Sequence, residues 1–600
     1  MPLRAAVTLI AVFLVHLRAQ AIDAPDAKGP IRHVVLFKWK DGAPAADIEK
    51  AIQEFDRLPS KIPGIIGFER GVDSSPEGLA RGFTHAFIVS FVDAAARDTY
   101  LPHAEHKGFV EKALPLIAEV LVVDFVPQAG TPGLRVEKGL APHQVFQRDE
   151  NNRAVVAFSG SSAADGPVEA RVLLGGKPLD GLDWKEAGRA SSGKFEARMQ
   201  GVPAGGPYGV EVRAGGSGVT AVDDILVGDL WILAGQSNME GVGNLENAPA
   251  PDARVHVFSM AHEWKLASEP LHWLIDSPDP VHSGAGIRDM DDAGRKAARA
   301  AARKDRKKGA GLGLPFAKEL VSRTGIPIGL IASAHGGTSM AQWDPAGRDR
   351  GGETLYGSMH RQVQAAGGKV KGVLWYQGES DANPKDAPLY AERMGALVKA
   401  FRDDFRAPDL PFLMVQLGRF ATESARGDWN TIQELQRLVP DSVKGVSVVP
   451  AVDLPLDDPI HIGTTGLERL GKRLARVAHR EVHGASRIGP GPRLESVRVL
   501  EGRRAIEVAY SGVNGRLRPG EGILGFSIAA EDGKDLPIIY AARTARGNPS
   551  AVILELGAPA PETARLWYGR GMNPAVNLAD EEDMAAPVFG PAPLDGKAAP

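Results

Sequence analysis

The sequence predicts an α/β protein whose centre is a parallel sheet flanked by helices. Between residues 227 and 483, apolar runs typical of buried strands alternate with segments of helical periodicity, and this alternation is typical of a parallel sheet covered on both faces. Residues 31–126 mix strand and helix patterns in a unit of their own, and shorter strand patterns flank the centre. We therefore expect an amino-terminal ferredoxin-like α+β domain, an α/β core and two flanking β-domains.

Residues 1–21 have the pattern of a secretory signal peptide. Arg4 supplies positive charge, and residues 5–17 form an apolar core that only His16 interrupts and that is too short to span a bilayer comfortably. Ala19-Gln20-Ala21 is a small-x-small cleavage sequence. We expect a secreted or periplasmic protein, with an uncleaved anchor or a soluble helix as the alternatives. No later apolar run approaches the length of a membrane span.

Composition narrows the class of protein further. At 600 residues the chain is long enough for several domains. Its net charge of -4 argues against a general nucleic-acid binder. The chain has no cysteine, which excludes disulfides, thiolate catalysis and thiolate zinc sites.

The first domain is expected at residues 31–126. Strand patterns occupy residues 34–39, 65–70, 85–92 and 120–126, and helical patterns occupy residues 45–58, 94–100 and 109–117. This order suggests a small α+β domain of ferredoxin-like type.

Three short segments of this domain are similar to a known family. They are His33-Val34-Val35-Leu36-Phe37, Pro63-Gly64-Ile65 and Tyr100-Leu101-Pro102-His103-Ala104-Glu105-His106. They resemble the stress-responsive dimeric α/β-barrel (Dabb) domain. Because such domains commonly pair through their sheets, the resemblance implies a homodimer. His103 and His106 form a metal pair in one interpretation, but we favour a helix entry with structural or surface histidines.

A Pro- and Gly-rich linker is expected at residues 128–139, followed by a β-sandwich at 141–226. The strand patterns of the sandwich lie at residues 154–158, 168–174, 194–199 and 208–213. A second β-domain is expected at residues 490–590, with strands at 495–500, 505–510, 523–529, 551–556 and 564–568. From residue 579 onward we expect a poorly ordered tail.

The core strand of the α/β domain is expected at residues 230–234, and it breaks at Gly235. Ser237 follows two residues later, where a strand gives way to a helix. In open α/β sheets, ligands bind at the carboxyl ends of strands, so Ser237 is well placed to meet a substrate. On its own, however, a serine at this position more often caps a helix.

The residues that complete a nucleophilic site lie downstream. A serine needs an adjacent base, and the base needs an orienting group. Asp458 stands three residues before His461, so one loop can deliver both groups. Position 239 is Met, which excludes the G-x-S-x-G nucleophile elbow of ordinary α/β-hydrolases.

Further strands of the core end in polar residues or glycines. Residues 328–332 lead to His335-Gly336-Gly337-Thr338, and residues 372–376 lead to Gln377 and Glu379. Two more strands are expected at 412–416 and 446–450, and helices at 314–324, 386–401 and 465–478. The basic run at residues 295–308 is most simply a solvated helix or insertion.

Four ordered blocks now indicate a family. They are Gly235-Gln236-Ser237-Asn238-Met239, His335-Gly336-Gly337-Thr338-Ser339, Trp375-Tyr376-Gln377-Gly378-Glu379-Ser380-Asp381 and Asp458-Pro459-Ile460-His461. Over residues 135–590 the chain resembles the sialate O-acetylesterase branch of the SGNH (GDSL-like) hydrolases. The resemblance implies a flavodoxin-like core at 227–483, flanking β-domains, and deacetylation of carbohydrate esters without a metal or other cofactor.

The resemblance also implies roles for individual residues. Ser237 is expected to be the nucleophile, His461 the base and Asp458 its orienter, with Glu379 as the alternative acid. The expected oxyanion donors are the Ser237 N–H, an N–H of Gly336 or Gly337, and the Gln377 amide, which stands where many SGNH enzymes have Asn. Four tryptophans lie near the blocks: Trp231, Trp343, Trp375 and Trp429. Trp343 is the preferred sugar contact, whereas Trp231 and Trp375 lie within strand patterns. Asn430 and Gln433 are weaker candidates.

Two other functions stay open at this point. One is a catalytically inactive carbohydrate-binding or scaffold protein that dimerises through the Dabb domain. The other is a glycosidase that uses Glu379 with Asp457 or Asp458 as its carboxylate pair. The sequence does not select among sialate, acetyl-xylan and other acetylated glycans as the substrate.

Overall fold

The computed structural model describes residues 30–127, 134–215, 218–283, 287, 290–422 and 428–594. The expected signal peptide at residues 1–21 lies outside this part of the chain. Contacts divide the protein into two compact units, Met1–Thr131 and Pro132–Pro600. Within the described residues, no helix is long and apolar enough to cross a membrane.

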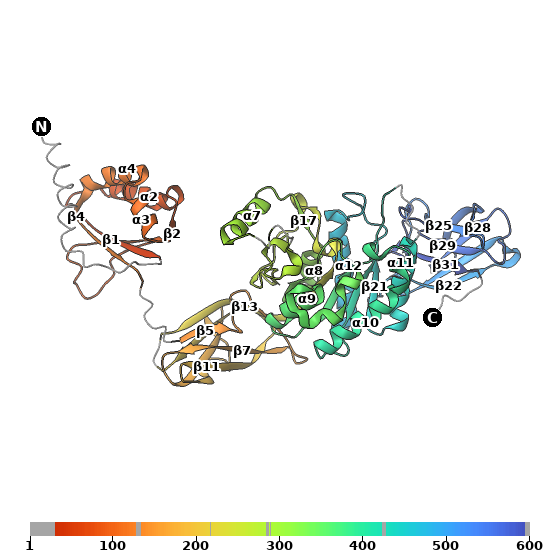
Figure 1. Cartoon of the computed structure of the whole chain (residues 1–600), viewed down its shortest axis with the longest axis horizontal. Coiled ribbons are helices and arrows are strands. Elements are labelled where there is room, and N and C mark those ends of the chain that lie inside the picture. Colours follow the sequence, from red (N-terminus) through yellow and green to blue (C-terminus); the bar gives the residue numbers. More distant parts are fainter. Residues whose placement is uncertain are drawn as a thin grey trace. The chain divides into compact units, whose positions relative to one another are not determined.

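The first unit is an antiparallel sheet with helices packed on one face (Figure 1). The strand order is β2-β3-β1-β4, as expected for a ferredoxin-like domain. The elements are β1 (Ile31–Trp39), α2 (Ala45–Lys61), β2 (Ile65–Val72), β3 (His85–Phe91), α3 (Ala94–Tyr100), α4 (Ala104–Ala113) and β4 (Ile117–Phe125). The core is aromatic: the rings of Phe37, Phe55, Phe87 and Phe109 contact one another.

The other face of this sheet is apolar but open. On β4, the side chains of Leu121, Val123 and Phe125 are 46%, 50% and 47% exposed. Leu121 and Val123 lie opposite Leu36 and Val34 of β1. Since residues directly opposite each other share a face of the sheet, these side chains form a contiguous apolar surface.

The second unit begins with an antiparallel β-region whose strands enclose a core of alternating buried residues. Its strand order is β13-β12-β8-β10-β11-β7-β5. The strands are β5 (Leu134–Lys138), β6 (Val145–Gln147), β7 (Arg153–Ser162), β8 (Gly166–Leu174), β9 (Lys177–Pro178), β10 (Lys185–Ser191), β11 (Lys194–Pro203), β12 (Gly205–Ala214) and β13 (Thr220–Gly235). The prediction of a linker at residues 128–139 is wrong at its carboxyl end. Residues Leu134–Lys138 form β5, which pairs with β7.

The 16-residue strand β13 joins this region to the α/β core. Its first half pairs with β12, from Thr220 to Val227, and its second half pairs with β18 and β19, from Asp229 to Gly235. The predicted boundary at residues 226/227 therefore falls inside one continuous strand. Such a strand leaves little freedom between the β-region and the core.

The core is a mainly parallel sheet in the order β15-β18-β13-β19-β20-β21, with β16 antiparallel at the edge. Five of these strands follow the flavodoxin-like order. If β15 is left out and the others are numbered 1 to 5 along the chain (β13, β18, β19, β20 and β21), their order across the sheet is 2-1-3-4-5. These strands are β15 (Val255–Phe258), β16 (Trp264–Leu266), β18 (Ile328–Ala332), β19 (Gly372–Tyr376), β20 (Phe412–Gln416) and β21 (Val446–Pro450).

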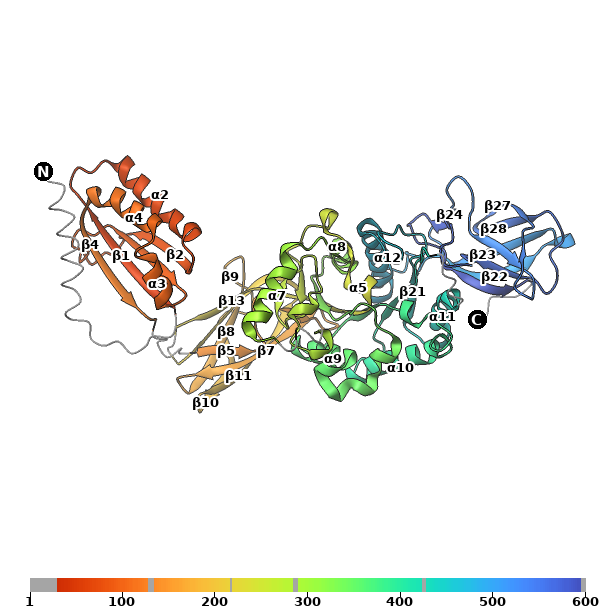
Figure 2. The same cartoon turned by 45° about the horizontal axis from the view of Figure 1, so that its top comes forward.

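Helices cover both faces of the core sheet (Figure 2). α8 and α12 lie on one side, and α9 and α10 lie on the other. The helices are α5 (Ser237–Glu240), α7 (Asp292–Lys304), α8 (Gly313–Thr324), α9 (Leu355–Ala365), α10 (Tyr390–Asp404), α11 (Trp429–Ser442) and α12 (Thr464–His483). The basic run forms α7, which has no buried residue, and continues into β17 (Lys308–Ala310).

The carboxyl-terminal region contains two four-stranded sheets, β22-β23-β28-β27 and β26-β25-β29-β31, and a two-stranded sheet of β24 (Leu517–Arg518) and β30 (Ala579–Asp580). The strands are β22 (Arg493–Val499), β23 (Ala505–Ser511), β25 (Phe526–Ala529), β26 (Asp535–Leu536), β27 (Ile539–Ala545), β28 (Asn548–Leu556), β29 (Arg565–Tyr568) and β31 (Phe589–Pro593). The prediction of a poorly ordered tail from residue 579 onward is wrong for residues 579–594. Met584, Val588 and Phe589 are buried there, and β31 pairs with β29.

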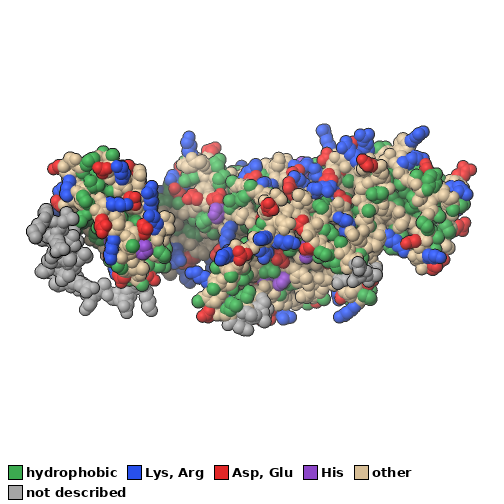
Figure 3. Space-filling view, turned by 90° about the horizontal axis from the view of Figure 1, so that it is seen from above, with side chains coloured by type: hydrophobic (Ala, Val, Ile, Leu, Met, Phe, Trp, Pro, Cys, Tyr) green, Lys and Arg blue, Asp and Glu red, His purple; other side chains and the backbone are tan. Residues whose placement is uncertain are grey.

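The surface carries charges of both signs. On the face that Figure 3 shows, acidic, basic and hydrophobic side chains are interspersed. This mixture agrees with the small net charge of -4.

Candidate active site

The turn after β13 places Ser237 at the carboxyl edge of the sheet. Gly235 has a φ of +132°, and a Cβ on it would lie 2.1 Å from the carbonyl oxygen of Tyr376. Only glycine fits there, because neither the angle nor the space admits a side chain. The chain turns away at this point, and Ser237 begins the short helix α5.

Three side chains meet at this edge. The Oγ of Ser237 is 3.0 Å from Nε2 of His461, and Nδ1 of the same ring is 2.8 Å from Oδ2 of Asp458. The backbone N–H of His461 also donates to Asp458, over 2.9 Å. The carboxylate therefore holds both the ring and the backbone of the histidine, in the arrangement that orients a base toward a hydroxyl.

The carboxyl group of Asp458 is strongly acidic. Its partial burial opposes ionisation, but hydrogen bonds from the His461 ring and from the N–H groups of Ile460 and His461 prevail and lower its pKa to about 2. Nζ of Lys308, from the basic segment, lies 3.4 Å from the same carboxylate. Asp458 is thus ionised at neutral pH.

Glu379, the alternative acid, faces a different partner. Its Oε1 accepts a 2.9 Å hydrogen bond from the Asn238 amide, and its side chain is buried. Burial raises the pKa of Glu379. Of the two acids, Asp458 is the one that contacts the imidazole of His461.

The glycine loop after β18 lies against Ser237. A Cβ on Gly336 would be 3.3 Å from the Cβ of Ser237, so the glycine loop packs closely beside the serine. The N–H of Gly336 donates to Oε2 of Glu240 over 2.8 Å. Gly337 is exposed with a φ of +70°, and among the described residues its N–H has no acceptor.

A buried histidine, His282, contacts this loop through His335. Nδ1 of His282 is 3.0 Å from Nδ1 of His335, and Nε2 of His282 is 3.0 Å from the hydroxyl of Ser358. Ser358 in turn donates to Asp279 over 2.5 Å. Burial and the neighbouring His335 lower the pKa of His282 to about 3, so its ring is neutral and holds the loop through hydrogen bonds alone.

Gln377 does not face the open site, contrary to the expectation that its amide is an oxyanion donor. The side chain is fully buried, and Nε2 donates to the carbonyl of Thr338 over 3.0 Å and to Asp381 over 2.5 Å. Both partners belong to the rim: Thr338 follows the two glycines, and Asp381 also accepts from the N–H of Met340. In this geometry, Gln377 positions the glycine loop.

A polar cleft of 610 Å³ opens beside the glycine loop. It begins at His335, Gly336 and Gly337 and continues along the segment that follows them. The other side chains that line it are mostly polar, including those of Gln342, Asp344, Arg350 and Glu353. Many groups of this kind suit a ligand with several hydroxyls.

Comparison with known proteins identifies the family. Residues 227–480 match the model of the family described as carbohydrate esterase, sialic acid-specific acetylesterase. A probable carbohydrate esterase of Arabidopsis thaliana is 30% identical over 270 residues, which cover 41% of this chain and 88% of the relative. The chain belongs to this carbohydrate esterase family. Its homologues support esterase activity.

Two further relatives of the esterase region agree. The solved structure of a carbohydrate acetylesterase from Xanthomonas citri superposes with a TM-score of 0.54 at 25% identity, and covers 76% of this chain and 99% of that one. Human sialate O-acetylesterase is 25% identical over 240 residues, which are 34% of this chain and 43% of the human protein.

The amino-terminal unit belongs to a second family. Residues 31–127 match the stress responsive A/B barrel (Dabb) domain. A stress-response A/B barrel domain-containing protein of Arabidopsis thaliana is 36% identical over 102 residues, which cover 17% of this chain and 94% of the relative. In this unit His103 caps α4, and His106 contacts the carbonyl of Leu101 over 3.0 Å.

The expectation that Trp343 contacts sugar is wrong. The ring is fully buried, packs edge-on against Trp375 and donates to the hydroxyl of Thr338 over 3.1 Å. Trp231 and Trp429 are also buried. The two weaker candidates for a sugar contact, Asn430 and Gln433, use their amides within the protein. The Asn430 amide donates to the carbonyl of Gly569 over 3.1 Å, and the Gln433 amide donates to the carbonyl of Leu417 over 2.9 Å.

Sequence reasoning missed the residues that support the site. Asn238, Glu240 and Lys308 contact Glu379, Gly336 and Asp458, respectively. The sequence offered one signal: Asn238 and Glu240 lie within the serine block, at one and three residues after Ser237. Nothing in the local pattern of Lys308 distinguishes it from the other basic residues of its segment.

Proposed function

We propose that this protein is a secreted serine esterase that removes O-acetyl groups from carbohydrates, such as sialate or acetylated polysaccharide. The observation that best supports it is the 3.0 Å contact between Ser237 Oγ and His461 Nε2, with Asp458 behind the ring. Family membership supports the reaction class. The signal-like residues 1–21 support export.

The reaction proceeds in two halves. His461 Nε2 takes the proton of Ser237 as Oγ attacks the acetyl carbonyl carbon, and the C–O bond to the sugar then breaks. The sugar oxygen leaves with the proton from His461. Water next attacks the acetyl-serine, with His461 again as base, and acetate leaves as Oγ regains its proton. Asp458 stays ionised throughout and stabilises the charged imidazolium.

The oxyanion is assigned to two backbone donors, the N–H groups of Ser237 and Gly337. Neither has an acceptor among the described residues. The Gly336 N–H already donates to Glu240, and the Gln377 amide donates to Thr338 and Asp381. A single oxyanion donor typically contributes about 3 to 4 kcal/mol to the transition state. Glu240 and Gln377 then act by holding the loop that presents Gly337.

The leaving sugar is assigned to the polar cleft beside this loop. The cleft adjoins Gly336 and Gly337, so a sugar bound there places an acetyl group next to Ser237. Arg350, Asp344 and Glu353 supply charged hydrogen-bonding groups along it. These groups support a polyhydroxylated leaving group over an apolar one.

The test is acetate release across a panel of acetylated glycans, comparing the wild type with Ser237→Ala. Ser161→Ala, on β7 of the antiparallel β-region, is the matched control. We expect the wild type and the control to release acetate and Ser237→Ala to lose at least about 10³-fold in kcat. Full activity of Ser237→Ala would refute the nucleophile, and an inactive wild type would favour the non-catalytic scaffold.

The Dabb unit is proposed to form a homodimer through its open sheet face. Leu121, Val123 and Phe125 leave an apolar surface in contact with Val34 and Leu36. An apolar sheet face of this kind is normally covered. A second copy of the same sheet covers it with a matching apolar surface.

A further inference from the structure

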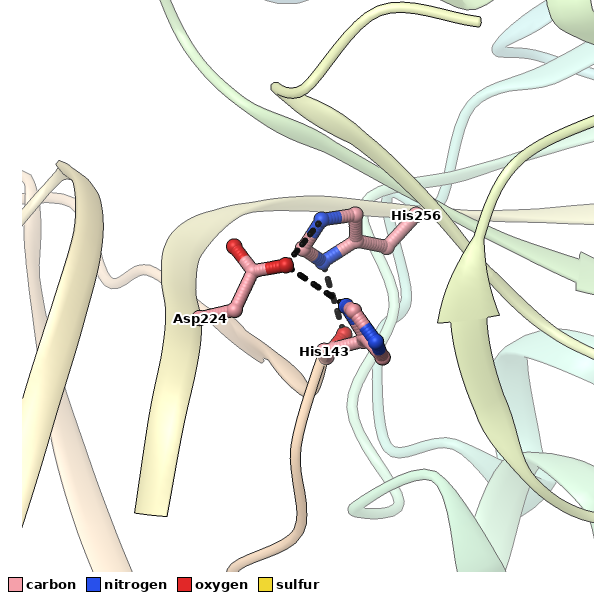
Figure 4. Close-up of side chains that lie close together, drawn as sticks. All are labelled: His143, Asp224 and His256. Atoms are coloured by element: carbon pink, nitrogen blue, oxygen red, sulfur yellow. Dashed lines mark hydrogen bonds and ion pairs between the residues drawn. The ribbon is translucent and has the colours of Figure 1, made fainter. Parts of the chain in front are cut away.

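Two histidines and one aspartate that take no part in the candidate active site point toward one another: His143, Asp224 and His256 (Figure 4). His143 precedes β6, Asp224 lies early in β13, and His256 is the second residue of β15. One ligand atom from each lies within 4.8 Å of the other two. Within the part of the chain that the structure describes, this is the one group of three such residues with metal-binding geometry.

The contacts set the tautomer of His256. Its Nδ1 is 2.7 Å from the carbonyl oxygen of His143, and a carbonyl can only accept, so Nδ1 carries the proton. In the neutral ring, Nε2 therefore carries a lone pair and can only accept a hydrogen bond or bind a cation. A backbone carbonyl that fixes a histidine in this way is typical of metal-binding histidines.

The Nε2 atom of His256 then lacks a suitable partner. The side chain is fully buried and Nε2 makes no hydrogen bond. It faces Oδ2 of Asp224 at 3.6 Å, which places a lone pair against a carboxylate oxygen. A buried polar atom without a partner is costly, and a cation between the two atoms removes the cost.

The third group completes the arrangement. Nδ1 of His143 is 2.6 Å from the same Oδ2 of Asp224. The side chains of His143 and Asp224 are 39% and 35% exposed, so an ion can enter from solvent. Both residues have left-handed backbone, with φ of 62° and 60°, a conformation that costs free energy in non-glycine residues.

We propose that His143, Asp224 and His256 bind a divalent transition-metal ion, with Zn²⁺ as the preferred ion. Two imidazoles and one carboxylate are a donor set that zinc favours. Ligands around a tetrahedral zinc lie about 3.3 Å apart, and the 3.6 Å separation between Asp224 Oδ2 and His256 Nε2 is close to this distance. His143 Nδ1 is hydrogen-bonded to the same Oδ2 at 2.6 Å, so on binding the ion it gives up its proton and moves outward by about 0.7 Å. The fourth position faces solvent and takes water.

The role of this site is structural. The three ligands come from the antiparallel region, the strand shared by both sheets and the edge of the core, so one ion ties these segments together. Asp224 and Gly235 are eleven residues apart on β13, about 36 Å along an extended strand, which separates the ion from Ser237. The ion takes no part in the proposed esterase chemistry.

The test uses the full chain after removal of metal with a chelator. Zinc binding is measured by calorimetric titration, and melting is measured with and without zinc. The variants are Asp224→Asn and His143→Ala, and Asp223→Asn is the matched control because it changes the exposed neighbour in the same strand. Circular dichroism checks that each variant folds.

We expect one tight zinc per wild-type chain and a melting temperature that rises with zinc. Asp224→Asn and His143→Ala should each weaken binding at least about 100-fold and abolish the shift, whereas Asp223→Asn should behave as the wild type. Absence of zinc binding would overturn the proposal. A proton on Nε2 of His256 would then stand in place of the metal ion between that atom and Asp224. Equal binding by all variants would also overturn it, because the ion would then lie on other histidines.

Discussion

The side-chain oxygen of Asn238 accepts a 3.0 Å hydrogen bond from the backbone N–H of Ile462. Asn238 follows Ser237 in the chain, and Ile462 follows His461. The same amide donates to Glu379 over 2.9 Å and to the carbonyl of Ile460 over 3.3 Å. One buried side chain therefore holds the backbone on both sides of the histidine at a set distance from the serine.

Replacing Asn238 with alanine should therefore misplace His461. We expect kcat to fall about 10²-fold, since small displacements of a base have effects of this size, and the free energy of unfolding to fall by about 1 to 3 kcal/mol. Asn430→Ala is the matched control, because its amide ties α11 to Gly569; it should lose stability but keep kcat. An unchanged kcat for Asn238→Ala would refute this role.

If Asp458 and not Glu379 is the acid that orients His461, conservative substitutions of the two residues should lower kcat by different amounts. Asp458→Asn removes the charge that stabilises imidazolium and should lower kcat about 10³- to 10⁴-fold. Glu379→Gln keeps an oxygen for the Asn238 amide and should cost less than about tenfold. Steady-state kinetics on one acetyl ester measure both, and the reverse order would make Glu379 the acid.

The depressed pKa of Asp458 predicts a pH window for stability. A carboxyl group with a pKa of about 2 in the folded state and 3.8 when unperturbed stabilises the fold above its unfolded pKa. This contribution is lost as the pH falls through the folded pKa. The difference in urea midpoint between the wild type and Asp458→Asn should be fully present at about pH 4.5 and shrink between about pH 4 and 2. A difference that disappears already near pH 6 would contradict it.

The burial of Trp343 predicts a stability effect in place of a binding effect. Trp343→Ala leaves a cavity against Trp375 and an unpartnered Thr338 hydroxyl, and should cost about 3 to 5 kcal/mol of unfolding free energy. The KM of the folded fraction should stay within about twofold of the wild type. Trp184→Ala, at a partly exposed ring in contact with Arg213, is the control and should cost less. A raised KM with unchanged stability would restore the sugar contact.

The apolar face of the Dabb sheet predicts the assembly. Val123→Arg places a charge in that surface and should convert a dimer to a monomer in light scattering, with kcat/KM unchanged. Val155→Arg is the control, because Val155 on β7 is 52% exposed, close to the 50% of Val123. A monomeric wild type, or a Val123→Arg variant that stays dimeric, would contradict the proposed interface.

Much of the fold follows from local pattern. Periodicity placed the helices near α8, α10 and α12 and the strands near β18 to β21, because burial on one face imposes a repeat on the residues. The β5 strand and the segment at 579–594 were missed, since Pro and Gly near them are typical of loops. Their strand character comes from pairing with β7 and β29, which no local window contains.

By itself, the sequence determined the chemistry available at the site: which residue types end the strands, in which order, and that Asp458 and His461 share one loop. Only the tertiary structure decided where each side chain points. Gln377 and Trp343 lie near the motifs yet turn into the core, while His143, Asp224 and His256 meet from separate segments. The physical reason is that periodicity and turn residues act over a few neighbours, whereas the direction of a buried polar group depends on partners brought together by packing.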